Sequence, residues 1–333
     1  IAGFYFNWDA PPPTWNFYAY DSTGKETLVD SGGGNCGWTE FAQVPASMSN
    51  YKTFKLEATN PEIAFAIADL SVYAGAIPEF VPQWESYDGN RMDLLVIAAH
   101  PDDECVFLGA PAVTYANEGK TVVTGYMTWG TSDRRYEAEE ACWMLGEQYA
   151  PTMRAAHDMM ANSLESMERY WPLDKAVGYI VELIRKYKPS VIVTHDVGGE
   201  YGHGAHMETS LATQLAFEQA SDPTKYPESA AKYGVWTAGK LYLHMYEKDK
   251  LTFDLNAPLD KFHGETVLET VSAAFHRHQS QEAKGWALET TGRCSMEYFG
   301  LFASHVGPDV MHDSMFENIS QSVMDGINGV SLP

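Results

Sequence analysis

The fold is decided by residues 94–104, which read LLVIAAHPDDE. The apolar run at 94–99 is unbroken, as expected of a parallel strand that is buried on both faces. One histidine and three acidic residues follow within residues 100–104. In doubly wound folds, ligands bind just beyond the carboxyl ends of the strands. The stretch therefore predicts a buried strand that carries chemically active side chains to the edge of a sheet.

Strands and helices alternate along the chain after residue 91. Further strand-like runs lie at 121–128 and 190–194, and helical patterns lie at 106–117, 134–145, 173–187 and 271–281. Such alternation predicts an α/β fold, with a Rossmann-like, mostly parallel sheet flanked by helices.

The first part of the chain has a different pattern. Apolar residues alternate with polar ones around 4–8, 15–19, 54–58 and 63–67, with Pro, Gly and Asn between them. This period predicts a small antiparallel β-sandwich or barrel. Residues 77–90 are interpreted as a linker. We expect an accessory domain at 1–88 and an α/β domain at 89–333. The aromatic residues of the accessory domain are either its core or a carbohydrate-binding surface.

A second polar cluster follows the strand predicted at 190–194. Residues 194–206 read THDVGGEYGHGAH. Because parallel strands end at the same edge of a sheet, we expect this cluster to meet the first one. His203 and His206 are three residues apart, so a helix would place both imidazoles on one face. Together, the two clusters supply three ligands and leave a coordination position open, as a catalytic zinc ion requires.

Simpler interpretations remain open for several of these residues. Acidic residues are favoured in the first turn of a helix, so residues 102–104 could be only a helix start. His195 and Asp196 could support an ion or only cap a loop. His276 and His278 are interpreted as core or surface residues rather than ligands.

The AHPDDE segment at 99–104, the HxxH at 203–206 and their positions at strand ends resemble the PIG-L/LmbE-like N-deacetylases. This family includes N-acetylglucosaminylphosphatidylinositol deacetylase, the mycothiol-pathway deacetylase and diacetylchitobiose deacetylases. The resemblance covers about residues 93–299. It includes the Arg134-x-x-Glu137 pair and the HQSQ segment at 278–281.

The resemblance implies a ligand set and a base. His100, Asp103 and His206 are expected to bind Zn²⁺, and Asp102 is expected to be the general base. In the expected reaction, Asp102 accepts the proton of the attacking water. The sequence leaves open which residue then protonates the departing amine.

Three further residues, His203, Tyr201 and Arg134, are assigned by the same resemblance, and Glu104 is a further candidate. His203 is expected to polarise the amide carbonyl and stabilise the oxyanion, with Tyr201 nearby. Arg134 and Glu104 are expected to bind substrate. One departure concerns the residue before the last ligand: many members have Asp there, and this chain has Ala205. The missing carboxylate puts the tuning of His203 in doubt.

The predicted function is hydrolysis of the acetamide of an N-acetylated amino sugar or glycan. The alternatives are an amidase acting on another N-acyl or thiol-conjugate substrate, and an inactive carbohydrate-binding protein. The chain has 22 Lys and Arg against 45 Asp and Glu, a formal charge of -23, which disfavours nucleic acid and anionic membranes as partners.

No apolar segment is long enough to span a bilayer. The chain begins with Ile1 and shows no signal-peptide pattern, so it is expected to be a mature form, a trimmed form or a fragment. The expected location is secreted or cell-surface, with cytoplasmic as the alternative. The pattern does not predict an oligomeric state.

Overall fold

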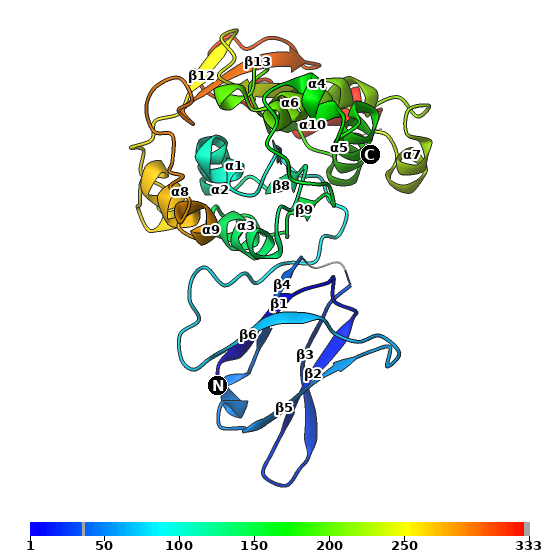
Figure 1. Ribbon diagram of the computed structural model, residues 1–333, viewed down its shortest axis with the longest axis vertical. Helices are drawn as coiled ribbons and strands as arrows, with labels where there is room; N and C mark the ends of the chain where they lie inside the picture. Colours follow the sequence, from blue (N-terminus) through cyan, green and yellow to red (C-terminus); the bar gives the residue numbers. More distant parts are fainter. Residues whose placement is uncertain (35–36, 330–333) are drawn as a thin grey trace.

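The computed structural model describes residues 1–34 and 37–329 (Figure 1). In these residues, the N-terminal unit consists of two antiparallel sheets with the strand orders β4-β1-β6 and β3-β2-β5. Its elements are β1 (Gly3–Trp8), β2 (Trp15–Tyr20), β3 (Glu26–Gly32), β4 (Thr39–Gln43), the 3-10 helix η1 (Ala46–Met48), β5 (Thr53–Ala58) and β6 (Ile67–Tyr73). Trp8 and Trp15 are buried in a core to which both sheets contribute. The predicted antiparallel architecture is therefore confirmed, and these two tryptophans belong to its core.

The strand predicted at 63–67 is wrong in position. A turn begins at Asn60, whose carbonyl oxygen accepts a hydrogen bond from the Ile63 amide at 3.1 Å. The Asn60 side chain also accepts the Glu62 amide at 3.1 Å. Strand β6 therefore begins only at Ile67. Residues 74–93 contain no helix or strand and lead to the second unit. The boundary at residue 88 stays a prediction.

The second unit is built on a mixed sheet. Within the described residues the strand order is β12-β13-β11-β10-β7-β8-β9. The strands are β7 (Leu94–Ala98), β8 (Val122–Tyr126), β9 (Thr152–Met153), β10 (Val191–Thr194), β11 (Lys240–His244), β12 (Lys250–Thr252) and β13 (Tyr298–Ser304). The neighbours from β11 to β9 pair in parallel, whereas β13 and β12 form an antiparallel edge. The predicted mostly parallel sheet is confirmed.

Helices cover both faces of this sheet. One core contains side chains from α1 (Asp103–Val106), α2 (Gly109–Asn117), α3 (Ser132–Met144) and α8 (Val267–Phe275). The other contains side chains from α4 (Leu164–Glu168), α5 (Leu173–Tyr187), α6 (Gly204–Gln219) and α10 (Gln321–Ile327). The remaining helices are η2 (Glu200–Gly202), α7 (Pro227–Tyr233), η3 (Asp260–Phe262) and α9 (Gln279–Glu282). None of the described helices is long and apolar enough to cross a membrane.

Two helices predicted as continuous are interrupted. The pattern at 106–117 contains the last residue of α1 and all of α2, and the two helices separate at Phe107 and Leu108. The pattern at 271–281 breaks between α8 and α9, where His278 has a non-helical backbone (φ -78°, ψ 55°). His278 is fully buried there and contacts Glu104. The helix breaks where His278 makes this contact with a distant part of the chain. Helical periodicity is a local pattern, so it cannot predict such a break.

Candidate active site

The carboxyl ends of two adjacent parallel strands bring the candidate site together. His100 and Asp103 follow β7, and His206 lies in α6, which follows β10. All three side chains are buried, and one potential ligand atom of each lies within 4.8 Å of the others. Asp103 Oδ2 is 3.2 Å from His100 Nδ1, and its Oδ1 is 3.3 Å from His206 Nε2. The two clusters predicted from the sequence therefore meet at one rim.

The donor atoms of this trio fit a divalent cation. In residues 1–34 and 37–329, Nε2 of His100 and Nε2 of His206 are buried without a hydrogen-bond partner. Burial raises the pKa of Asp103, but the imidazoles of His206 and His195 outweigh burial and hold this pKa well below its usual range. Two imidazoles and one ionised carboxylate are typical ligands of a catalytic zinc ion.

A fully buried carboxylate, Glu200, lies behind the trio. It accepts hydrogen bonds from Nδ1 of His195, His206 and His244 at 2.8, 2.7 and 2.6 Å. A carboxylate that orients a ligand histidine in this way fixes the tautomer and the direction of the ring. Nε2 of His206 is thereby left for an ion. His244 Nε2 lies 2.9 Å from a second polar atom, the Ser295 carbonyl oxygen, so contacts on both sides hold this ring in place.

His195 and Asp196 take separate roles. The Ala99 amide donates to His195 Nε2 at 2.9 Å, so this nitrogen is not free to bind an ion. The His195 ring stacks on that of His206 with 4.2 Å between the centroids. Asp196 accepts the Gly198 amide at 2.9 Å and caps the loop. His195 thus supports the site, while Asp196 stabilises the turn.

Asp102 lies beside the trio in an unusual backbone conformation, with φ 124°. Such strain in a residue other than glycine is typical of functional sites. Arg134 Nη2 donates to Asp102 Oδ1 at 3.1 Å and to the Pro101 carbonyl, and its Nη1 donates to Asp158 Oδ2 at 2.9 Å. Burial and the charge of Asp103 raise the pKa of Asp102, and Arg134 opposes them. Arg134 lines the cavity and also holds the predicted base in place.

His203 lines the same cavity and caps α6. Its Nδ1 accepts the Ala205 amide at 3.0 Å. Burial and the imidazoles of His100 and His206 lower the pKa of His203 to about 3. The ring is therefore neutral near pH 7, and its proton is on Nε2. The side chain at position 205 is not needed for this arrangement, because the contact uses only the backbone amide.

Tyr201 and Glu104 are placed very differently. Tyr201 lines the cavity, is 53% exposed and has a left-handed backbone (φ 46°). Glu104 is fully buried and is absent from the described lining of the cavity. Its carboxylate accepts the Asp102 amide at 2.8 Å and is hydrogen-bonded to His278. The structure does not bring Glu104 to the position of a substrate contact. It lies under Asp102 instead.

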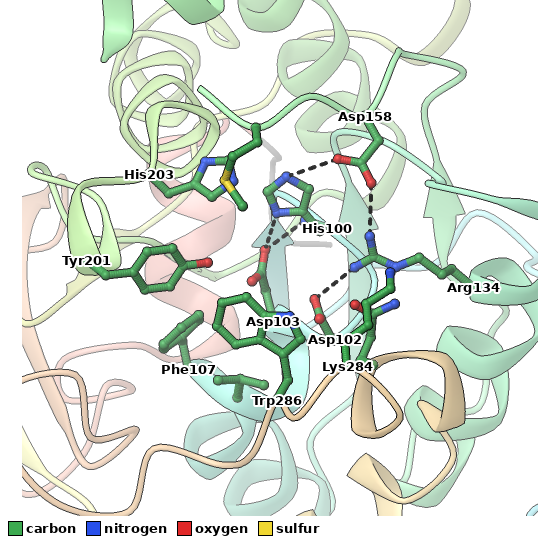
Figure 2. A pocket seen from close by; sticks show the side chains of 13 residues that line it. His100, Asp102, Asp103, Phe107, Arg134, Asp158, Tyr201, His203, Lys284 and Trp286 are labelled. Atoms are coloured by element: carbon green, nitrogen blue, oxygen red, sulfur yellow. Dashed lines mark hydrogen bonds and ion pairs between the residues drawn. The ribbon is translucent and has the colours of Figure 1, made fainter. Parts of the chain in front are cut away.

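The cavity above the trio measures about 340 Å³ (Figure 2). Figure 2 shows Arg134 and Asp158 on one side and Tyr201, Phe107 and Trp286 on the other. Sequence reasoning missed a group of lining residues that come from irregular segments: Asp158, Met160, Lys284 and Trp286. These segments have no periodic pattern that could have identified them. Glu200 was also missed, although an acidic residue among the three histidines of residues 195–206 is a signal.

A protein-family model described as PIG-L, GlcNAc-PI de-N-acetylase, matches residues 95–217. The chain is 31% identical over 170 residues to mycothiol S-conjugate amidase of Streptomyces coelicolor, covering 44% of this chain and 57% of the relative. It is 32% identical over 182 residues to 1D-myo-inositol 2-acetamido-2-deoxy-alpha-D-glucopyranoside deacetylase of Thermobifida fusca, covering 46% and 62%. The chain thus spans little more than half the length of these relatives.

Among solved structures, N,N'-diacetylchitobiose deacetylase from Pyrococcus horikoshii is similar, with a TM-score of 0.44 and 19% identity. The similarity covers 57% of this chain and 70% of that one. The family match spans the strands β7 and β10 and includes the trio and Asp102.

Proposed function

The chain contains a PIG-L family domain at residues 95–217, and from this premise we propose that it hydrolyses the acetamide of an N-acetylated amino sugar or glycan. The products would be acetate and a free amine. The observation that carries the proposal is the meeting of His100, Asp103 and His206 beside a cavity. His100, Asp103 and Asp102 line this cavity. The deacetylase relatives support the substrate class.

We propose Zn²⁺ as the ion that His100, Asp103 and His206 hold. When bound at such a site, zinc lowers the pKa of water and polarises a carbonyl group. The ordering of His206 by Glu200 supports a site built for a metal, because the carboxylate fixes the ligand before the ion arrives.

Asp102 would serve as the base that removes a proton from the attacking water. It lines the cavity as a carboxylate and is held by Arg134, so its free oxygen has a defined direction. Once protonated, Asp102 carries the proton that the departing amine requires. A raised pKa suits a group that must first accept and then return a proton.

His203 would donate a hydrogen bond from Nε2 to the oxygen that becomes negative during attack. The Ala205 amide occupies Nδ1, so the proton of the neutral ring is on Nε2. A neutral imidazole donates a hydrogen bond but is a weak acid. This favours Asp102 over His203 as the source of the amine's proton. Tyr201, whose ring is 5.8 Å from that of His203, would lie next to the same oxygen.

The test combines metal analysis with product release. The purified chain is assayed for zinc by elemental analysis and for acetate release from N-acetylglucosamine, N-acetylgalactosamine and chitooligosaccharides. We expect bound zinc and acetate release that stops on treatment with a chelator and returns with added zinc. Acetate release that a chelator leaves unchanged would contradict the zinc proposal.

A thiol conjugate of an N-acylated amino sugar belongs in the same screen, because one relative is named an amidase. Cleavage of this conjugate without acetate release from any N-acetyl sugar would favour the amidase alternative. No turnover of any amide, together with no bound metal, would overturn the hydrolase proposal itself.

A further inference from the structure

Helix α3 contacts both units of the molecule. Figure 1 shows it on the side of the α/β unit that faces the sandwich. Arg134, in its first turn, reaches the cavity and binds Asp102 and Asp158. Arg135 and Tyr136, the next two residues, point to the sandwich instead. The helix is therefore a direct link between the N-terminal unit and the base of the candidate active site.

The central contact is made by Glu139, which is fully buried. Its Oε1 accepts the Trp38 amide at 2.6 Å, and its Oε2 accepts the Thr39 amide at 2.8 Å and the Thr39 hydroxyl at 2.7 Å. All three donors belong to the sandwich. Gly37 makes room for this contact, since a Cβ atom there would lie 2.1 Å from Glu139 Oε1.

Two more contacts hold the same helix. The Arg135 guanidinium lies 3.9 Å from the centroid of the Trp38 ring. The Tyr136 hydroxyl donates to the Trp8 carbonyl at 2.9 Å. Trp38, one of the aromatic residues of the accessory domain, is therefore used in the contact between the units. A shift of α3 would leave the buried Thr39 amide and the part-buried Trp38 amide without their acceptor. Folded proteins avoid buried polar groups without partners.

We propose that the N-terminal sandwich is a positioning element of the active site, in which Glu139 fixes α3 so that Arg134 holds Asp102. The inference rests on the proposed function, because it assigns Asp102 to the reaction. Glu139 is a positioning residue, since it reaches the substrate only through Arg134. On this view the sandwich is a structural part of the enzyme and not a detachable carbohydrate-binding module.

Loss of the contact can be produced from either unit. Glu139→Ala removes the acceptor from α3, and Gly37→Ala pushes the carboxylate away from the sandwich. Displacements of about 1 Å in a catalytic arrangement cost about a hundredfold in rate. We expect each variant to lower kcat about ten- to a hundredfold, with KM and zinc content little changed. Leu28→Ala, at an exposed position of β3, is the control and should leave kcat unchanged.

A double-mutant cycle with Arg134→Ala separates positioning from general loss of structure. If Glu139 acts through Arg134, Glu139→Ala should lower kcat no further once Arg134 is absent. Glu139→Gln, which keeps one acceptor oxygen, should restore part of the activity. Additive effects of Glu139→Ala and Arg134→Ala, or full activity of both Glu139→Ala and Gly37→Ala, would overturn the inference.

Amide hydrogen exchange keeps the inference testable if the proposed function fails. If the wild-type chain turns over no amide, then the proposed function is at fault and the positioning is judged by exchange alone. In the full chain, we expect Gly37→Ala and Glu139→Ala to speed exchange at residues 132–140 at least tenfold, with Leu28→Ala as wild type. Unchanged exchange in both variants would overturn the positioning role whatever the activity.

Discussion

Two fully buried carboxylates, Glu200 at the rim of the sheet and Glu139 between the sandwich and α3, have opposite surroundings. Glu200 accepts hydrogen bonds from three imidazoles, those of His195, His206 and His244. Glu139 accepts hydrogen bonds from two backbone amides and one hydroxyl. Burial alone would raise the pKa of both.

The hydrogen-bond partners of each carboxyl group decide whether its pKa falls or rises. For Glu200, burial is outweighed by His195 and by the hydrogen bonds of the three imidazoles, so its pKa is well below the usual range. For Glu139, burial outweighs its neutral donors and raises the pKa to about 7. The rim thus keeps a permanent charge that orients His206, whereas the contact between the units titrates near neutral pH. Buried acids are therefore not equivalent, and the difference lies in whether their hydrogen-bond donors are imidazoles or backbone amides and a hydroxyl.

The largest effect is expected at the rim, from Asp102→Asn. The amide keeps the size of the side chain but cannot accept a proton from water. We expect kcat to fall by about 10²–10⁴-fold, with zinc content unchanged. Acetate release and elemental analysis measure the two quantities. Asp69→Asn, at an exposed position of β6, is the control. Full turnover by Asp102→Asn would remove this residue from the mechanism.

The next effect tests the charge behind the trio. Glu200→Gln cannot accept three hydrogen bonds, so His206 loses its fixed tautomer. We expect zinc affinity to fall by about 10–100-fold, measured by competition with a chelator. The matched control is Glu208→Gln, at a buried acidic residue of α6 whose side-chain oxygens have no hydrogen-bond partner among the described residues. Equal affinities of Glu200→Gln and wild type would show that the three-imidazole arrangement is not needed for the ion.

The third effect is on stability at the contact between the units. Glu139→Ala leaves the buried Thr39 amide and the part-buried Trp38 amide without this acceptor. We expect the free energy of unfolding to fall by about 3 kcal/mol, from the cost of unsatisfied buried donors. Urea unfolding measures it. Leu28→Ala should change it by less than about 0.5 kcal/mol, as surface substitutions do. If Glu139→Ala and Leu28→Ala lowered the free energy of unfolding equally, the hydrogen bonds of Glu139 would contribute nothing to stability.

The smallest effect is the pH dependence of the stability that Glu139 contributes between the sandwich and α3. Folding raises the pKa of Glu139 from its ordinary value of 4.5 to about 7, so the folded chain binds the proton more tightly than the unfolded chain. This contribution to stability is present at low pH and is lost as the pH rises to about 7. Between pH 5 and 7 it amounts to about 2 kcal/mol. Glu139→Gln should lose this part of the pH dependence in thermal unfolding. If stability depended on pH in the same way in Glu139→Gln and in the wild type, this would contradict a raised pKa of Glu139.

The sequence by itself determined the α/β unit and the chemistry at its rim. The apolar run at 94–99 encodes a strand buried on both faces, and residues 190–194 encode its neighbour. Since parallel strands end at one edge, the side chains that follow them had to meet. That reasoning brought the two clusters to one rim, where ligand atoms of His100, Asp103 and His206 lie within 4.8 Å of one another. The choice of these three residues as ligands came from the family resemblance and stays a proposal. The reasoning about the rim succeeded because periodicity and strand ends are properties of residues close in sequence.

Only the tertiary structure decided what surrounds this chemistry. The residues Glu139 and Thr39 are 100 positions apart, and Glu104 and His278 are 174 apart. No local pattern encodes such contacts, because they depend on how completed elements pack. Glu104 was expected to contact substrate, but packing places its carboxylate against the Asp102 amide. Packing also makes Glu200 the partner of three imidazoles. Local patterning specified which groups reach the rim, and long-range packing set their charge and orientation.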